Sequence, residues 1–253
     1  MPSIRGYLKR KWLESKLEQP PLVVDSPVPE TGLSVSFVVH TWYEYHNRAR
    51  GSYTGEPDMV DWLKTELRTG DVLWDIGANV GAYSLLAAKL CPGARVVAFE
   101  PFIPNFAHLW ENVVLNGVTS QVHPVNIGLS DKSGPTVLGV NDPRAGSSNH
   151  QVGGGAGKAT QNLLAFSGDD AVTKLGLSAP TMLKLDIDGL EVEAVRGLEK
   201  TLRLPTLRTV MIEVESGKSE DPVLKLCEAA GLRRVSNPLN HSTEGVFNAR
   251  FAR

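Results

Sequence analysis

The sequence predicts an α/β fold in which a mostly parallel sheet has helices on both faces and ends in an antiparallel hairpin. Short apolar runs alternate with segments of helical periodicity over most of the chain. A glycine-containing turn follows the apolar run 72–76, and no helix separates the last two runs. Alternating strands and helices form parallel sheets covered on both faces. Two strands joined without a helix pair antiparallel instead.

The expected elements follow from periodicity and from the residues that begin or end helices. Residues 1–31 are rich in proline toward their end and are expected to be an irregular lead-in. Pro57 marks the start of the first helix, whereas Gly117 and Gly231 mark helix ends. The expected strands are 33–40, 71–76, 95–99, 122–127, 181–187, 209–214, 232–236 and 245–251, and the expected helices are 57–67, 80–90, 103–116, 189–202 and 222–230.

Residues 141–160 form a long stretch rich in turn-forming residues, with four glycines in the run 153–157. No strand is expected directly before these glycines, so they do not predict a phosphate-binding loop. Two interpretations stay open. The segment is either a mobile flap over an active site or a disordered surface loop.

Size and composition are those of an ordinary globular protein that needs no disulfides. The 253 residues suggest an N-terminal extension over 1–52 and a main domain over 53–253. The formal net charge of −2 gives no general attraction to nucleic acid. The two cysteines, Cys91 and Cys227, are expected to be buried free thiols. No stretch has the length of a membrane span, so we expect no stable membrane insertion and a cytoplasmic location. A basic amphipathic segment at 4–13 is expected to pack on its own domain.

The turn after the strand at 72–76 predicts a ligand site. It reads Asp75-x-Gly77-x-Asn79-x-Gly81 and lies at the carboxyl end of a strand, where open α/β sheets bind ligands. Its two glycines would let the backbone approach a ligand closely. The spacing differs from the Gly-x-Gly-x-x-Gly pattern that binds a pyrophosphate, and Asp75 would repel such a group. A carboxylate suits a cation instead, and S-adenosylmethionine carries a sulfonium and an ammonium. The competing interpretation is that Asp75 merely caps the following helix.

Glu100 strengthens the prediction of a nucleoside cofactor. It lies at the end of the next strand, 23 residues after Gly77. A carboxylate at this place can accept hydrogen bonds from both hydroxyls of a ribose. The turn and Glu100 together therefore predict S-adenosylmethionine as the cofactor.

Taken in order, a set of motifs resembles the FkbM family of S-adenosylmethionine-dependent methyltransferases. The resemblance covers about residues 53 to 215 and implies a class I, Rossmann-like methyltransferase fold. It also implies methyl transfer, usually to a hydroxyl oxygen, often in natural-product or saccharide pathways. Asp188 departs from the family pattern, which has Glu there. The motifs are Tyr53-x-x-Glu-Pro57, Asp75-x-Gly-Ala-Asn-x-Gly81, Phe99-Glu-Pro101 with Asn105 and Asn116, Asn126-Ile-Gly-Leu-Ser-Asp131, Leu183-Lys-Leu-Asp-Ile-Asp-Gly-Leu-Glu191 and Met211-Ile-Glu-Val-Glu215.

We expect the cofactor to contact four groups of residues. The turn should surround the methionine part, Glu100 should hold the ribose, and the residues after the next two strands should lie near the adenine. Tyr53 and Glu56 should close over the amino acid end. The expected cofactor-binding residues are Tyr53, Glu56, Asp75, Gly77, Ala78, Asn79, Gly81, Glu100, Pro101, Phe102, Asn126 and Ile127.

Methylation of a hydroxyl requires a base that takes the proton during attack. Asp186, at the end of the strand at 181–187, is the first candidate for base or acceptor anchor. Capping of the following helix is the competing role for Asp186, and capping is the role we expect for Asp188. His241 and His46 are alternative bases, although each is also an ordinary surface or packing histidine.

No metal is expected. Asp186, Glu213 and Glu215 would be the ligands if a Mg²⁺ ion were bound, but acidic groups at strand ends usually meet water or an amine.

Several functions stay open besides O-methylation of a small molecule that carries a hydroxyl. N-methylation needs less help from a base. Loss of Asp75 or Glu100 would favour a non-catalytic protein that binds a nucleoside cofactor, but both residues are present. Modification of nucleic-acid bases is disfavoured because Asp186-Ile-Asp-Gly189 replaces the aromatic corner that holds a flipped base. The turn spacing disfavours an NAD-dependent oxidoreductase.

Overall fold

A computed structural model describes residues 11, 21–148, 150–154, 157–237, 239 and 245–253. Its central sheet has the strand order β12-β13-β11-β10-β3-β4-β5. The five strands from β11 to β5 run parallel, whereas β13 pairs antiparallel with both β11 and β12. This arrangement confirms the predicted mostly parallel sheet with an antiparallel hairpin at its edge. The bounds are Val72–Ile76 (β3), Arg95–Phe99 (β4), Val122–Val125 (β5), Met182–Leu185 (β10), Thr209–Glu215 (β11), Arg233–Val235 (β12) and Val246–Ala252 (β13).

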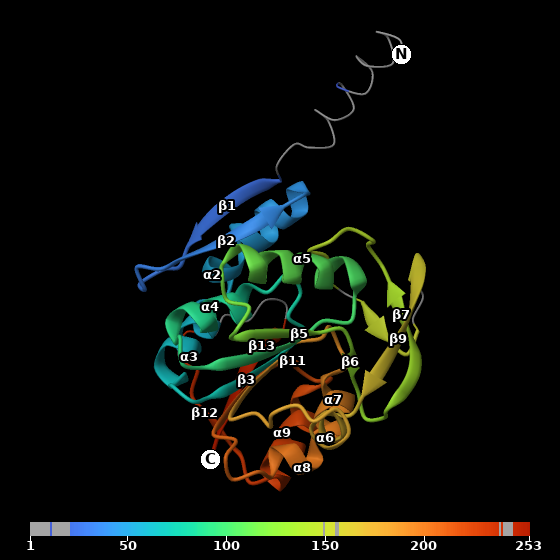
Figure 1. The fold of residues 1–253 in the computed structure, drawn as a ribbon. Coiled ribbons are helices and arrows are strands. Elements are labelled where there is room, and N and C mark those ends of the chain that lie inside the picture. The colour runs from blue at the N-terminus through green and yellow to red at the C-terminus, as the bar shows by residue number, and fades with distance from the viewer. Residues whose placement is uncertain (1–10, 12–20, 149, 155–156, 238, 240–244) are drawn as a thin grey trace.

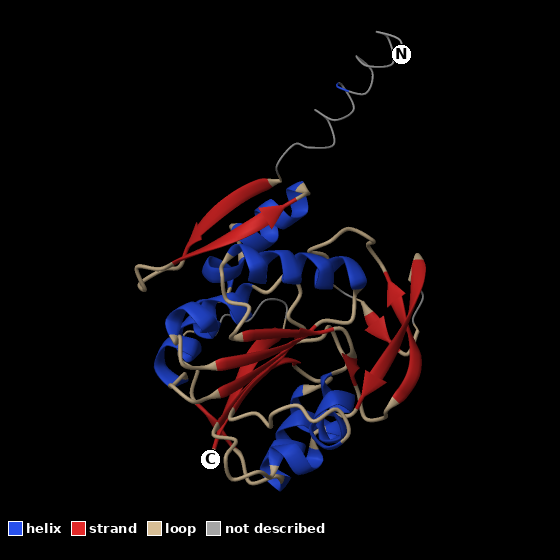
Figure 2. Ribbon diagram, in the orientation of Figure 1, coloured by secondary structure: helices blue, strands red, loops and turns tan. Residues whose placement is uncertain are grey.

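Helices cover both faces of this sheet, as Figure 2 shows. One face packs against helices α3, α4 and α5 in a cluster that includes Met59, Leu85 and Leu109. The other face packs against α6 to α9 in a cluster that includes Val195 and Val223. The bounds are Pro57–Glu66 (α3), Ala82–Leu90 (α4), Ile103–Leu115 (α5), Gly168–Thr173 (α6), Glu191–Gly197 (α7), Glu199–Leu202 (α8) and Glu220–Ala229 (α9). Among the described helices, none is long and apolar enough to cross a membrane.

The single helix predicted over 189–202 is wrong, because the structure has α7 and α8 with a break at Leu198. The cause lies far away in the sequence. The Asp169 carboxylate accepts hydrogen bonds from the backbone N–H groups of Lys200 and Thr201, at 2.9 and 2.8 Å. An acceptor at this place satisfies amides that would otherwise continue the first helix.

The expectation of an irregular lead-in over 1–31 is wrong for its last part. Strand β1 (Leu22–Pro27) pairs antiparallel with β2 (Ser34–Val39), which confirms the strand predicted over 33–40. Two short helical turns follow, η1 (Glu44–Ala49) and α2 (Ser52–Gly55). Strand β2 lies against α5, where the Asn112 and Asn116 side chains accept the N–H groups of Val38 and Ser36. Residues 1–10 and 12–20 lie outside the described residues, and the division at residue 52 stays a prediction.

A second sheet, with the order β6-β9-β7-β8, lies beside the first (Figure 1). Its strands are Gly128–Leu129 (β6), Gly134–Val140 (β7), Gln151–Val152 (β8) and Ala159–Phe166 (β9). The loop predicted over 141–160 is therefore wrong at β8 and at the start of β9. Strand β9 pairs with β7 over seven residue pairs, from Gly134↔Ala165 to Val140↔Ala159. This pairing joins segments that look irregular when each is taken alone.

Candidate active site

A cavity lies at the carboxyl ends of the parallel strands, where α/β sheets bind ligands. Strand β3 lies between β4 and β10 in the sheet, so the cavity has two sides. The Glu100 side comprises Asn79, Glu100 and Ile127. The Lys184 side comprises Glu56, Lys184, Asp186 and Glu213. Other lining residues include Arg48, Ser52, Gly77, Ala78, Tyr83, Pro101, Ser147, Ser148, His150 and Asp188.

The turn after β3 holds its shape through left-handed backbone conformations. Gly77, Asn79 and Gly81 have φ values of +80°, +52° and +94°. A Cβ on Gly77 would lie 1.8 Å from the backbone oxygen of Asp186. A Cβ on Gly81 would lie 2.6 Å from a methyl carbon of Leu109. The two glycines thus allow close packing of the protein on itself, and only Gly77 of the two also lines the cavity.

Glu100 is buried and holds the turn through both of its carboxylate oxygens. One oxygen accepts the N–H of Asn79 at 2.8 Å and the other the N–H of Phe102 at 2.9 Å. Burial raises the pKa of Glu100 to about 7 despite these two donors. A carboxylate has about four lone-pair positions, and because the Asn105 side chain is a third donor to Glu100, one position stays free for a ligand in the cavity.

The structure places the other residues expected near a nucleoside around Glu100. Pro101 and Ile127 line the cavity. Phe102 packs instead in a small cluster with Leu138 and Val140. The Asn126 side chain donates to the backbone oxygen of Glu100 at 2.8 Å, so it supports the site from behind.

Asp75 lies beneath the cavity rather than in its wall. It is fully buried in β3, and Ser84 Oγ donates to its carboxylate at 2.6 Å. Lys184 Nζ lies 3.4 Å from the same carboxylate. The carboxylate is thus a buried counterion for this lysine, and it does not cap helix α4, which begins after Gly81 with no side-chain cap.

Lys184 connects the turn to β10, and sequence reasoning missed it. Its ammonium is buried, donates to the backbone oxygen of Gly77 at 3.0 Å and lies 3.2 Å from Asp186. Burial acts to lower the pKa of Lys184, but the carboxylates of Asp186 and Asp75 outweigh it, so the pKa is raised and the group is charged. The sequence signal is its place two residues before Asp186 in the apolar strand, where a cation needs a buried partner.

Three carboxyl groups gather on the Lys184 side. Burial and the charge of Asp186 raise the pKa of Glu56 to about 7. Burial, Asp186 and Glu56 together raise the pKa of Glu213 to about 9. Glu213 is therefore protonated at neutral pH. Asp186 keeps the direct contact with Lys184, and its carboxylate is partly exposed to the cavity.

The cap ahead of α7 does not come from Asp186. Glu191, in the first turn of the helix, reaches back and accepts the N–H of Gly189 at 2.9 Å. Asp188 lines the cavity with a left-handed backbone conformation, φ +57°. Tyr53, expected at the amino acid end, is buried behind the wall and donates its hydroxyl to the backbone oxygen of Ala82 at 2.9 Å.

Of the histidines considered as bases, neither is brought to the cavity by the described structure. His46 lies on η1 with its ring stacked on Trp42, and it does not line the cavity. His241 lies outside the described residues. His150, which sequence reasoning missed, does line it. Its Nε2 lies 3.0 Å from Ser147 Oγ, and burial lowers its pKa, so the ring is neutral at neutral pH.

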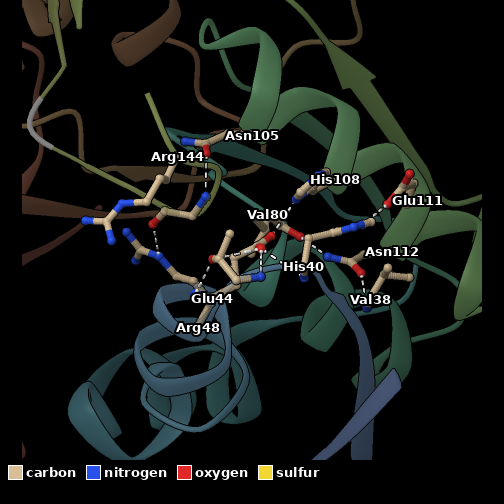
Figure 3. Close-up of polar contacts among 12 residues, drawn as sticks. Val38, His40, Glu44, Arg48, Val80, Asn105, His108, Glu111, Asn112 and Arg144 are labelled. Atoms are coloured by element: carbon tan, nitrogen blue, oxygen red, sulfur yellow. Dashed lines mark hydrogen bonds and ion pairs between the residues drawn. The ribbon is translucent and has the colours of Figure 1, made fainter. Parts of the chain in front are cut away.

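The segment that carries His150 covers the turn. The backbone oxygen of Ser147 accepts hydrogen bonds from the Asn79 and Asn105 side chains, at 2.9 and 3.1 Å. Gly146 donates its N–H to Asn105 at 2.7 Å and accepts from Arg48 Nε at 2.7 Å (Figure 3). The described part of 141–150 thus lies over the cavity, as a flap would, whereas its mobility stays a prediction.

Comparison with known proteins identifies the family. The profile described as methyltransferase FkbM domain matches residues 75–233. The chain belongs to this family. It is also 30% identical over 196 residues to the hexuronic acid methyltransferase AglP of Haloferax volcanii, covering 78% of this chain and 77% of the relative. The 31-O-demethyl-FK506 methyltransferase FkbM of Streptomyces tacrolimicus is 29% identical, over 59% of this chain and 67% of that protein.

Solved structures confirm the fold of this FkbM-family methyltransferase. A precorrin-6y C5,15-methyltransferase from Geobacter metallireducens matches with a TM-score of 0.51 and 13% identity, over 81% of this chain and 90% of that one. A methyltransferase FkbM from Methylobacillus flagellatus matches with a TM-score of 0.51 and 17% identity, over 74% of this chain and 45% of that one. The predicted class I, Rossmann-like methyltransferase fold is thus confirmed.

Proposed function

We propose that this methyltransferase transfers the methyl group of S-adenosylmethionine to a hydroxyl oxygen of a small molecule. The observation that carries the proposal is the pairing of two chemically different sides in one cavity. The Glu100 side offers a carboxylate with room for one further donor. The Lys184 side offers carboxyl groups that suit cationic ligand atoms.

The residues present fit the cofactor. The free lone pair of Glu100 can accept a ribose hydroxyl, with Ile127 and Pro101 beside it as an apolar surface for a base. Across β3, Glu213 is neutral, but the carboxylates of Asp186 and Asp75 together with the partly ionised Glu56 outnumber the single ammonium of Lys184. This excess of negative charge favours the sulfonium and ammonium groups of S-adenosylmethionine over an anionic pyrophosphate. When bound, the cofactor supplies an activated methyl group.

Asp186 is the residue that we assign as general base. It faces the cavity from the end of β10, and its carboxylate lies 3.2 Å from Lys184 Nζ. Lys184 fixes the carboxylate in place, and a hydroxyl of the acceptor would donate its proton to the oxygen that faces the cavity. Glu213 is protonated at neutral pH because of its raised pKa of about 9. It therefore orients an acceptor oxygen by donating a hydrogen bond and does not take the proton.

The acceptor class rests on the relatives. One relative is named for a hexuronic acid and another for an O-demethylated natural product. Both names support a saccharide or a natural product with a free hydroxyl as the acceptor here. The cytoplasmic location stays a prediction of the sequence.

Calorimetric titration with S-adenosylhomocysteine tests the cofactor assignment. We expect micromolar binding to the wild type and binding at least tenfold weaker in Glu100→Ala, because the charge-assisted contact to the ribose is lost. Glu199→Gln is the matched control, since Glu199 is exposed on α8 and pairs only with Arg203 among the described residues. Binding that is equal in all three proteins would contradict the role of Glu100. No binding to a folded wild type would reject the cofactor assignment.

The acceptor is then sought with S-adenosylmethionine that carries a labelled methyl group. Saccharides with and without a carboxylate, and hydroxylated natural products, are compared with amines of similar size. Label on oxygen supports the proposal, whereas label found only on the amines would replace it with N-methylation.

A further inference from the structure

A second cluster of ionisable side chains lies outside the cavity, between β2 and α5. His40 follows the last residue of β2, and His108 and Glu111 are three residues apart on α5, so both lie on one side of that helix. One ligand atom from each of these three residues lies within 4.8 Å of the others. The two imidazole rings stack with their centroids 4.3 Å apart, and His40 Nε2 lies 2.9 Å from Glu111 Oε2 (Figure 3).

A buried fourth residue fixes the protonation of one ring. Glu44 is 2% exposed and contacts His108 Nδ1 through one carboxylate oxygen. Its other oxygen accepts the N–H groups of His40 and Thr41, at 3.1 and 3.0 Å.

A carboxylate oxygen accepts hydrogen bonds, so Nδ1 of His108 carries the proton in this contact. In the neutral ring, the lone pair is then on Nε2. A carboxylate that holds one ring nitrogen of histidine while the other binds a metal is the usual outer support of metal-bound histidines. His108 therefore has the tautomer and the fixed orientation of a ligand.

We propose that His40, His108 and Glu111 bind a divalent transition-metal ion of the Zn²⁺ type, with water as the fourth ligand. Two imidazoles and a carboxylate suit Zn²⁺ and Co²⁺, whereas Mg²⁺ and Ca²⁺ prefer oxygen ligands only. Tetrahedral bonds of about 2.1 Å place neighbouring ligand atoms roughly 3.4 Å apart. The ion would thus separate His40 from Glu111 by a few tenths of an ångström and draw His108 toward them. Such movements are within the reach of side chains that are exposed or half-buried at the surface.

The role that follows is structural. None of the three ligands lines the cavity. The ion would join the end of β2 to α5, next to η1, where Arg48 donates to Gly146 of the covering segment. Holding these elements together would stabilise the wall that the covering segment rests on, without placing the ion near the methyl group.

Spectroscopic titration tests the site in the 253-residue chain, without an affinity tag and after treatment with a chelator. Co²⁺ is the first probe, because a tetrahedral site with nitrogen and oxygen ligands gives visible absorption bands that aqueous Co²⁺ lacks in intensity. We expect one ion per chain with a micromolar or tighter dissociation constant, displacement of the bands by Zn²⁺, and a higher unfolding temperature with metal bound.

Four variants decide which residues bind. His40→Ala, His108→Gln and Glu111→Gln should each weaken Co²⁺ binding at least tenfold, and Glu44→Gln should weaken it about 10- to 100-fold through the lost support of His108. His123→Ala, at an exposed histidine on β5, is the matched control and should bind like the wild type. S-adenosylhomocysteine affinity should stay unchanged in His40→Ala and Glu111→Gln, which also shows that both are folded.

The proposal fails if the wild type gives no tetrahedral Co²⁺ spectrum at a tenfold excess of the ion. It fails equally if His40→Ala and Glu111→Gln bind Co²⁺ as tightly as the wild type. Both of these variants alter exposed side chains, so they settle the question even if His108→Gln does not fold.

Discussion

The two sides of the cavity stabilise buried carboxyl groups in different ways. On the Glu100 side, a single carboxylate is held by two backbone N–H groups of neighbouring loops. On the Lys184 side, Asp75 and Asp186 both pair with one buried ammonium, with Glu56 and Glu213 nearby. The first arrangement is built from residues 79–102, whereas the second collects residues from 56 to 213.

This difference assigns different tasks to the two sides. Backbone N–H donors are held in place by the fold and do not ionise, so the Glu100 side is suited to recognise a part of the ligand that does not change during the reaction. Coupled carboxyl groups around a lysine bind protons with different affinities, so the Lys184 side is suited to proton transfer. Variants on the Glu100 side should therefore change cofactor affinity, and variants on the Lys184 side should change rate or stability.

Asp186→Asn should have the largest effect on the reaction. The amide keeps the shape of the side chain but cannot take a proton, so kcat should fall about 10²- to 10⁴-fold. Affinity for S-adenosylhomocysteine should change only a few-fold, because the Glu100 contacts are intact. The measurement is kcat with labelled cofactor and the acceptor found by screening, together with calorimetry.

Glu100→Gln is the matched variant on the other side, and it should show the opposite pattern, with weak binding and a smaller loss of kcat at saturating cofactor. Equal losses of affinity and rate in both variants would remove the proposed division between the two sides.

Lys184→Met should have the largest effect on stability. It leaves the fully buried Asp75 carboxylate without its cation, and breaking such a pair costs about 3–5 kcal/mol of the free energy of unfolding. Urea denaturation measures the change. Lys174→Met is the control, because the Lys174 side chain is 64% exposed in its pair with Asp170, and such a pair contributes about 0–1 kcal/mol.

A further double variant, Lys184→Met with Asp75→Asn, should recover part of the loss because no charge is then left unpaired at Asp75. Equal stability of Lys184→Met and Lys174→Met would show that the buried pair contributes nothing.

The same contrast explains what could be predicted from the sequence. The central sheet and the helices α3, α4, α5 and α9 come from local periodicity, and the turn with Glu100 comes from spacing within 30 residues. Strand β1 and the strands of the second sheet, β6 to β9, were missed because their pairing partners lie elsewhere in the chain, and their own composition is irregular. The break at Leu198 was missed because Asp169 causes it from another element.

On the Lys184 side of the cavity, too, contacts between residues far apart in the sequence could not be predicted. Asp186 was predicted from its place at a strand end. The role of Lys184 was not, because its partners Asp75 and Gly77 are about a hundred residues away. Conversely, Asp75 and Tyr53 have motif positions that predict ligand contact, but in the fold both lie behind the wall. A motif thus locates a site without separating the residues that touch a ligand from those that support them.

The pH dependence of cofactor binding sharpens the comparison with a smaller effect. Burial raises the pKa of Glu100 to about 7, above its ordinary 4.5. Below pH 7 the group is protonated and offers fewer acceptors to the ribose, so affinity should rise with pH. A carboxyl group with this pKa is about one-tenth ionised at pH 6 and nine-tenths at pH 8. In calorimetric titrations, the affinity for S-adenosylhomocysteine should therefore be roughly tenfold higher at pH 8 than at pH 6.

Glu56 has a raised pKa of about 7 as well, so Glu56→Gln is the necessary control. The trend should persist in Glu56→Gln and disappear in Glu100→Gln. If the trend disappears in Glu56→Gln and persists in Glu100→Gln, the group whose titration changes the affinity is Glu56, on the Lys184 side.

Glu213→Gln should change function least. The side chain is protonated at neutral pH, since burial and the charges of Asp186 and Glu56 raise its pKa from 4.5 to about 9. An amide has the same shape and is also neutral, so kcat and cofactor affinity should stay close to those of the wild type.

The stability of Glu213→Gln is more informative than its activity. A raised pKa stabilises the fold below pH 4.5, and this contribution is lost as the pH rises toward 9. Glu213→Gln has no group that titrates here, so it does not lose stability in this way. Its free energy of unfolding, measured by urea denaturation, should equal that of the wild type at pH 4.5 and exceed it at pH 8. A variant less stable than the wild type at pH 8 would mean that Glu213 is ionised beside Lys184 and belongs with Asp186 as a second base.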